Sequence, residues 1–264
     1  MMWARDSIFL ALPDGKLMFM DGGCIASLGG RRTKTRLDIG EDVVSPYPCS
    51  RSIRSLDVVP LSHAHEDHIG GLAAILGNFH VKQLWTGATP ESPEWERLRQ
   101  RAVECGAGIV PLAEENQLQY GGAAFETLAP ALDYIPDTIP RNNDSLVLRV
   151  SFGERSLILT GDMERQIESE LVGRNRVAHA DVLKVAHHGS KTSTTAPFLD
   201  AVHPAFAVIS AGFENLYGHP HRDIIERLNE RKIGILQTDQ IGLITIRTDG
   251  HRLVVETRGV APAP

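Results

Sequence analysis

The segment Leu61–Leu72, which reads LSHAHEDHIGGL, contains metal-ligating side chains at high density. Three of the chain's eleven histidines occur there together with two acidic residues, in the order His63, His65, Glu66, Asp67 and His68. Imidazole and carboxylate groups hold Zn or Mn at neutral pH, and an apolar strand that leads into a short loop can aim several of them at one point. The spacing therefore predicts a metal site in preference to a solvated polar turn before a helix.

Two further stretches at predicted strand ends offer groups of the same kind. In LILTGD, a glycine lets the chain turn, and the carboxylate of Asp162 has two oxygens that can bridge two cations. The stretch KVAHHGSKTS contains the adjacent His187 and His188, of which we expect one to reach the metal directly, because neighbouring strand side chains point to opposite faces. The other is expected to orient the first or to act as general acid toward a leaving group.

An anion site is predicted directly after these histidines. Ser190 and Thr192 offer hydroxyls, Lys191 offers an ammonium group, and the start of the next helix adds backbone donors, a combination that suits a phosphate. Further on, in NLYGHPH, His219 precedes a proline that suits a first helical turn. This histidine either caps the helix or completes a metal's coordination, and we favour ligation. The remaining histidines have no such cluster and are interpreted as structural: His80, His179, His203, His221 and His251.

The elements that must position these groups combine strand–helix–strand units with two hairpins, the first turning at Pro13-Asp14-Gly15 and the second at Phe152-Gly153-Glu154. Strands are predicted at Ser7–Leu12, Leu17–Asp21, Val81–Trp85, Ile109–Leu112, Ala124–Leu128, Ser145–Val150, Ser156–Thr160, Asp181–Ala186, Ala205–Ser210, Ile235–Thr238, Gly242–Thr248 and Arg252–Thr257. Helices are predicted at Ile69–Phe79, Glu94–Cys105, Glu164–Leu171, Ala196–Val202 and Arg222–Arg231. This pattern is typical of an α/β protein with two sheets packed face to face and helices outside. We expect one domain over residues 1–264.

Composition narrows the class of protein. The charged fraction of 23% and the hydrophobic fraction of 42% are those of a globular protein, and no apolar run approaches the roughly 18 residues of a membrane span. The N-terminus lacks the cleavage site of a signal peptide and is predicted to form a strand. Three cysteines without CxxC spacing argue against a disulfide framework and a zinc ribbon. A net charge of −6 is not typical of nucleic-acid binders, although two divalent ions would offset about four of these charges.

The motifs together resemble a known family. LSHAHEDHIGGL, NNDSLVLRV, LILTGD, DVLKVAHHGSKTS and NLYGHP, in this order, are similar to the metallo-β-lactamase-type domain at the C-terminal end of the ComEC competence proteins, which are inner-membrane DNA uptake channels. The resemblance runs from about Ser7 to Gly250. It implies a four-layer αββα sandwich, one or two divalent metals, and hydrolysis of nucleic-acid phosphodiesters, proposed to degrade the strand that is not imported.

The resemblance also implies roles for individual residues. The implied metal ligands are His63, His65, Asp67, His68, Asp162, His187, His188 and His219. Asn142 and Asn143 stand where lactamase-like hydrolases supply a third histidine. His187 or His188 is expected to fill that vacancy, and His219 the second site. Two departures are visible: the family's opening Gly-Gln-Gly-Asp turn reads Trp3-Ala4-Arg5-Asp6 here, and His65 restores a superfamily histidine that many ComEC domains replace with Asp.

We therefore predict a metal-dependent phosphodiesterase or nuclease that uses two divalent ions, Zn or Mn, and acts on single-stranded DNA during uptake. Divalent ions held in this way activate water for attack on phosphorus. The predicted catalytic residues are Asp67, Asp162, His188 and Lys191, and the predicted substrate-binding residues are Asn142, Ser190, Lys191 and Thr192. The alternatives are a hydrolase of a small phosphodiester or lactone and, from another class, a non-catalytic metal-binding module.

The expected cellular location of the protein depends on whether the chain is complete. A complete chain without a signal peptide or membrane span is expected in the cytoplasm. An excised ComEC domain is expected at the outer face of the membrane, as part of a DNA channel or associated with one. No obligate protein partner is evident from the sequence.

Overall fold

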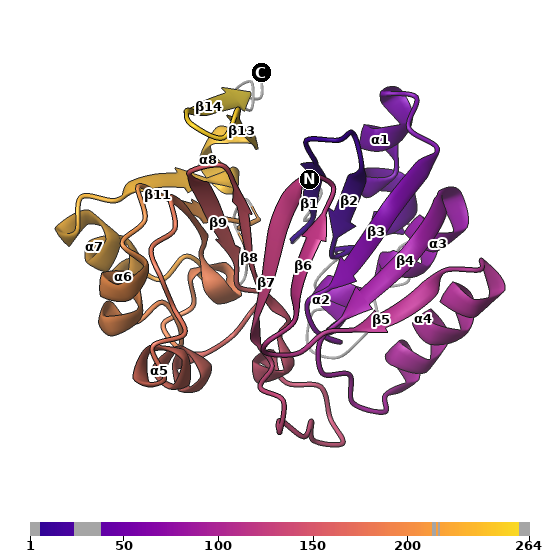
Figure 1. The fold of residues 1–264 in the computed structure, drawn as a ribbon, viewed down its shortest axis with the longest axis horizontal. Helices are drawn as coiled ribbons and strands as arrows, with labels where there is room; N and C mark the ends of the chain where they lie inside the picture. Colours follow the sequence, from indigo (N-terminus) through magenta and orange to yellow (C-terminus); the bar gives the residue numbers. More distant parts are fainter. Residues whose placement is uncertain (1–5, 24–37, 213–214, 216, 259–264) are drawn as a thin grey trace. The chain divides into compact units, whose positions relative to one another are not determined.

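A computed structural model describes residues 6–23, 38–212, 215 and 217–258 of the chain (Figure 1). The chain divides into two compact units: Met1–Leu112 with Asp133–Leu146, and Ala113–Leu132 with Val147–Pro264. Each unit has its own β-sheet and its own hydrophobic core. The single domain over residues 1–264 stays a prediction, and residues 3–5 of the altered opening turn lie outside the described residues.

The first unit is built on a five-stranded sheet. Its strands follow the order β1 (Ile8–Ala11), β2 (Leu17–Met20), β3 (Ser55–Leu61), β4 (His80–Thr86) and β5 (Gly108–Pro111). β1 and β2 form the predicted antiparallel hairpin, and the other neighbours in the sheet are parallel. Parallel strands read as near-continuous apolar runs. β3 is such a run, because its last four residues are all buried, and it leads directly into the histidine motif.

Short helices cover this sheet: η2 (Gly40–Val44), α1 (Pro46–Ser50), α2 (Glu66–Ile69), α3 (Leu72–Asn78) and α4 (Pro93–Glu104), with the 3₁₀ turn η3 at Asn142–Asp144. α4 begins where the hydroxyl of Ser92 accepts the N–H of Trp95 at 3.1 Å, and it ends just before Gly106, which takes a left-handed φ of 75°. The apolar faces of α3 and α4 pack with β3 in one core cluster. Each large side chain buried in this way stabilises the fold by about 1.5–3 kcal/mol.

The predicted helix Ile69–Phe79 is divided in the structure into α2 and α3, with Gly70 and Gly71 between them. A close approach of three chain segments requires glycine here. A Cβ on Gly71 would lie 2.2 Å from the carbonyl oxygen of Gly22, and a Cβ on Gly40 would lie 2.2 Å from that of Gly71. No side chain fits at such distances. The backbone of Gly22 also donates to the carbonyl of His68 at 2.7 Å, so this contact fixes the end of the histidine motif.

The second unit is built on a seven-stranded sheet. The strand order is β12 (Gly234–Gln237), β11 (Phe206–Ile209), β10 (Val182–Lys184), β9 (Arg155–Leu159), β8 (Val147–Phe152), β7 (Ala123–Ala129) and β6 (Gln117–Tyr120). β9 to β12 are parallel, whereas β6 to β9 are antiparallel, and β8–β9 is the second predicted hairpin. β13 (Leu243–Thr248) and β14 (Leu253–Arg258) form a separate antiparallel ribbon.

The helices of this unit are α5 (Arg165–Gly173), α6 (Ala196–Val202), α7 (Arg222–Glu230) and α8 (Thr238–Ile241), with the 3₁₀ turn η4 at Ala186–Gly189. α5, α6 and α7 lie along one side of the sheet (Figure 1) and contribute Leu171, Phe198, Leu199, Ile224 and Leu228 to its core. None of the helices in the described part of the chain combines the length and the apolar character of a membrane span.

Three sequence expectations are corrected. β6 was not predicted, although it pairs with β7. The strand expected at Asp181–Ala186 ends at Lys184, because the chain then enters η4. Thr238 begins α8 instead of ending a strand, and its hydroxyl accepts the N–H of Ala211 at 2.9 Å. All three differences lie at polar or irregular segments, where apolar periodicity gives little signal.

Candidate metal centre

Three imidazole rings are packed together at the end of β3. His63 and His68 are fully buried, and their ring centroids are 4.3 Å apart. His65 occupies the N-cap position of α2, and its ring centroid lies 4.6 Å from that of His63. The first unit therefore gathers the three histidines of the motif, as the sequence predicts. Asp67 is half-buried on α2 beside them.

Hydrogen bonds on the outer side of the rings orient two of these histidines. The Nδ1 of His68 donates to a carboxylate oxygen of Asp21 at 2.8 Å. The Nε2 of His65 donates to the carbonyl of Pro140 at 2.9 Å. Because a carboxylate and a carbonyl only accept here, the lone pairs are left on Nε2 of His68 and on Nδ1 of His65. An acceptor behind the ring is the usual arrangement for metal-ligating histidines.

The spacing of the ring nitrogens also fits a cation. Nε2 of His63 lies 3.0 Å from Nδ1 of His65. Two nitrogens bound tetrahedrally at about 2.0–2.1 Å from Zn would lie about 3.3 Å apart. The two nitrogens are hydrogen-bonded to each other in the structure, so they would have to move slightly apart to hold one ion between them.

Asp21 is the main positioning residue of this cluster. Its carboxylate is buried, and besides His68 it accepts the backbone N–H of Ser62 at 2.8 Å. The hydroxyl of Ser62 lies 3.1 Å from Nδ1 of both His63 and His68. Asp21 thus ties the end of β2 to the start of the histidine motif. Sequence reasoning assigned it only to the end of a strand.

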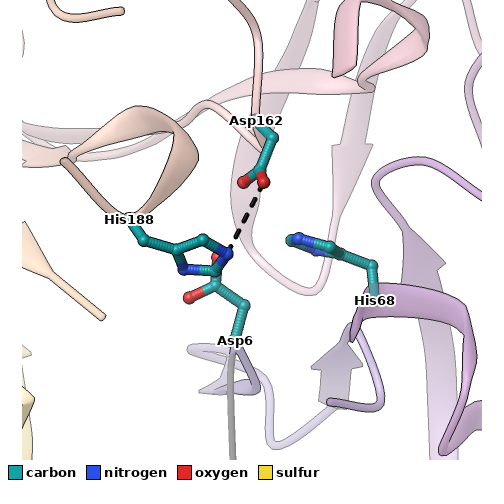
Figure 2. A group of neighbouring side chains, drawn as sticks. All are labelled: Asp6, His68, Asp162 and His188. Atoms are coloured by element: carbon teal, nitrogen blue, oxygen red, sulfur yellow. Dashed lines mark ion pairs between the residues drawn. The ribbon is translucent and has the colours of Figure 1, made fainter. Parts of the chain in front are cut away.

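The second unit contributes a buried carboxylate and a buried histidine. Asp162 follows β9 after Gly161, which takes a left-handed φ of 52°. Nε2 of His188 lies 3.5 Å from a carboxylate oxygen of Asp162, and the two side chains face each other (Figure 2). Nδ1 of His188 donates to the carbonyl of Ser210 at 3.0 Å, so the lone pair on Nε2 is directed toward Asp162.

The adjacent His187 has different neighbours. Its Nδ1 lies 3.5 Å from Glu164 and 3.3 Å from the hydroxyl of Thr192, and its ring centroid is 5.8 Å from that of His219. The expectation that strand alternation separates His187 from His188 had the wrong premise. Both residues lie in η4 with left-handed φ values of 49° and 54°, so their side chains diverge through a tight turn and not through a pleat.

The loop after η4 is held by buried groups. The Ser193 hydroxyl donates to the carbonyls of Ala186 and Ser190 at 3.0 and 3.2 Å. Glu168 of α5 accepts the N–H groups of Thr194 and Thr195, which lead into α6. The predicted anion site is corrected in this respect, because these two donors are bound by the protein's own carboxylate.

The other residues of the predicted anion site differ in their exposure to solvent. Lys191 is exposed, Thr192 is half-buried, and Ser190 is buried with its hydroxyl 3.1 Å from that of Thr192. Asn142 is half-buried in η3 of the first unit, two residues after the carbonyl of Pro140 that orients His65. The sequence therefore identified polar groups that border both histidine clusters.

His219 is not a helix cap. The cap of α7 is His221, whose Nδ1 accepts the N–H of Asp223 at 3.3 Å, so this histidine is structural as predicted. The backbone of His219 is bound on both sides by Asn215, which accepts its N–H at 2.9 Å and donates to its carbonyl at 2.5 Å. Pro220 precedes the cap and lies outside the first helical turn.

The described residues include one further candidate ligand that sequence reasoning missed. Asp6 is buried, and one of its carboxylate oxygens lies within 4.8 Å of a ring nitrogen of His68. Asp6 is the last residue of the opening turn and the one position at which this turn keeps the family's residue. That retained aspartate could have identified it as a candidate ligand from the sequence. Each unit thus offers a buried Asp–His pair with the donors a divalent metal accepts, Asp6 with His68 and Asp162 with His188.

The chain belongs to the metallo-β-lactamase superfamily, because the model of that family matches residues 46–212. The matched region contains the histidine motif, Asp162 and His188. The predicted fold class is therefore confirmed. Among solved structures, the metallo-β-lactamase fold protein YhfI from Bacillus subtilis superposes with a TM-score of 0.53 at 13% identity, covering 89% of this chain and 88% of that one.

Within this superfamily, the chain is similar in sequence to competence proteins. It is 38% identical over 248 residues to ComE operon protein 3 of Bacillus subtilis, which covers 92% of this chain and 31% of that protein. It is 35% identical over 202 residues to competence protein ComA of Neisseria gonorrhoeae, covering 76% of this chain and 26% of that protein. The expected resemblance to competence proteins is confirmed, and the chain spans about a quarter to a third of the length of these relatives. The chain is a metallo-β-lactamase-fold hydrolase related to competence proteins.

Proposed function

We propose that the chain is a metal-dependent phosphodiesterase that cleaves single-stranded DNA. The observation that carries the proposal is the orientation of the histidines. His65, His68 and His188 each donate one ring N–H to a protein acceptor, which is the usual orientation of metal-ligating histidines. The similarity to competence proteins supports DNA as the substrate.

We further propose that the chain binds two divalent ions, Zn or Mn. The proposed ligands are His63, His65, Asp67, His68, Asp162, His188 and, at the second ion, His187 or His219, with Asp6 as an additional carboxylate. When bound, such ions lower the pKa of water and stabilise charge on phosphoryl oxygens. A buried donor set of imidazoles and carboxylates has the chemistry that these ions require.

The protein's own groups have separate tasks in this proposal. Asp67 and Asp162 orient the attacking water. Lys191, which is exposed, neutralises the phosphate, and the hydroxyls of Ser190 and Thr192 donate to its oxygens. In the alternative role of general acid, His188 in its imidazolium form delivers the Nε2 proton to the leaving oxygen and returns to the neutral ring.

The test compares three substrates with the Mn-loaded and Zn-loaded protein: single-stranded DNA, a generic phosphodiester and a lactone. We expect hydrolysis of DNA, and we expect it to disappear with Asp162→Ala. Hydrolysis of the small phosphodiester or the lactone with intact DNA would favour the small-molecule alternative. Metal binding without turnover of any substrate would favour the non-catalytic module.

A matched pair of variants tests the phosphate contact. Lys191→Met and Lys232→Met each remove one exposed positive charge from the second unit. We expect only Lys191→Met to weaken DNA binding and to reduce the slope of log affinity against log salt by about one phosphate contact, about 0.7 for a single strand. Equal effects of the two variants would assign the loss to net charge alone.

A further inference from the structure

An exposed tyrosine ring is stacked beside the candidate metal centre of the second unit. The ring of Tyr217 is nearly parallel to that of His219, with an interplanar angle of 16° and centroids 6.1 Å apart. The tyrosine is 55% exposed, so its ring is accessible to a ligand. His219 in turn lies 5.8 Å from His187, measured between ring centroids.

The segment that carries this ring pair is fastened to the loop of His187 and His188. The carbonyl of Gly189 accepts the N–H of His221 at 2.8 Å. A Cβ on Gly189 would lie only 2.6 Å from the Cβ of Pro220, so the two backbones are in close contact. Asn215 binds both backbone groups of His219. The backbone that follows the tyrosine is therefore fixed against the loop of His188, and the ring itself contacts His219.

Four aromatic rings form a row in the order His188, His187, His219 and Tyr217. The distances between successive ring centroids are 6.3, 5.8 and 6.1 Å. The inner end of the row faces the carboxylate of Asp162, and its outer end is exposed to solvent. Proteins that bind single-stranded nucleic acids place an exposed aromatic ring next to groups that bind the backbone, so that a base stacks while its phosphate is held.

We propose that Tyr217 is a base-stacking residue, which binds a nucleobase of a single-stranded polynucleotide next to the phosphate held at the metal centre. The proposal rests on the phosphodiesterase function proposed above and names its substrate as a strand with bases. Stacking is tolerant of base identity, so this contact selects polynucleotides without selecting a sequence.

The test measures binding and cleavage with oligothymidylate and with an oligonucleotide of equal length that lacks bases. We expect Tyr217→Ala to weaken binding of oligothymidylate and raise its KM about 5- to 100-fold, the usual effect of losing one stacked base. The abasic strand, kcat and the metal content should be unchanged. Tyr217→Phe and Tyr217→Trp should keep the affinity, because each retains a ring. Leu243→Ala removes another exposed apolar side chain of the same unit and should have no effect.

Several outcomes would overturn the proposal. If Tyr217→Ala weakens binding of both strands equally, the ring contacts the sugar-phosphate backbone and not a base. If the variant loses metal, the ring is a structural support of His219. If the parent protein binds neither strand, both this proposal and the proposed function fail. If it binds oligothymidylate more tightly than the abasic strand, in a manner that depends on Tyr217, but cuts neither, then only the hydrolytic function fails.

Discussion

Replacing Glu168 by Ala should weaken the second unit at a position distant in sequence from the histidines. Glu168 on α5 has no solvent exposure, and its carboxylate accepts the N–H groups of Thr194, by a short hydrogen bond, and Thr195, at 2.8 Å. Arg227 of α7 binds the same segment from the other side, through the carbonyl of Thr194 at 2.5 Å. The substitution removes the acceptor of one buried donor, the N–H of Thr194, and of one half-buried donor, the N–H of Thr195.

The expected loss in the free energy of unfolding is about 2–4 kcal/mol. Each unsatisfied buried donor costs about 1–3 kcal/mol. The upper end of the sum is reduced because the carboxylate itself is costly to bury. This cost is visible in its pKa: burial raises the pKa of Glu168 above its ordinary value, although Thr194, Thr195 and Arg227 act in the opposite direction.

The raised pKa makes the effect depend on pH. A carboxyl group with a raised pKa in the folded state contributes stability that is fully present below its unfolded pKa, about 4.3, and is lost as pH rises through the folded pKa. Glu168→Gln cannot titrate. The unfolding free energy of the parent minus that of Glu168→Gln should therefore fall as pH rises above about 4.

The assay is urea unfolding of the parent, Glu168→Ala, Glu168→Gln and Glu170→Ala at several pH values. Glu170→Ala is the matched control, because Glu170 lies on the same helix and its carboxylate accepts an exposed hydrogen bond from Gln166 at 3.2 Å. If Glu168→Ala costs no more than this control, the carboxylate does not hold the start of α6. A difference between parent and Glu168→Gln that grows with pH would show that burial is not the dominant effect on its pKa.

Three other substitutions test the packing and the metal centre. Gly71→Ala should lower the free energy of unfolding by about 3 kcal/mol, because its Cβ would lie 2.2 Å from a backbone oxygen. Gly173→Ala, whose Cβ would have nothing within 4 Å, should leave that free energy unchanged or raise it by about 0.5–1 kcal/mol, and thermal melts of the two variants test the difference. Asp162→Ala should release most of the bound Zn or Mn, and unchanged metal content by elemental analysis would remove its role as a ligand. Asp21→Asn should weaken metal affinity about 10- to 100-fold in a chelator competition, and an unchanged affinity would mean that the orientation of His68 does not matter.

The sequence by itself determined which candidate ligand types are present and where in the chain they occur. The histidine motif, Asp162 and the pair His187–His188 each follow a strand, and this could be predicted because apolar runs and turn residues act over a few neighbouring positions. Both hairpins of the prediction were also confirmed, since their turns have local signals at Pro13-Asp14-Gly15 and Phe152-Gly153-Glu154. Family membership followed from the order of these motifs.

Only the tertiary structure decided how the ligands are oriented. The acceptor behind His65 is a carbonyl 75 residues away, Asp21 reaches Ser62 across 41 residues, and Glu168 reaches Thr194 across 26. The same holds for the distinction between His187 and His188, which depends on the Ser210 carbonyl and on left-handed backbone in η4, where strand periodicity does not apply. Sequence patterns report the periodicity of neighbouring residues. These partners meet because each of the two hydrophobic cores brings segments together that are distant in sequence. No local pattern records which buried donor will need which acceptor.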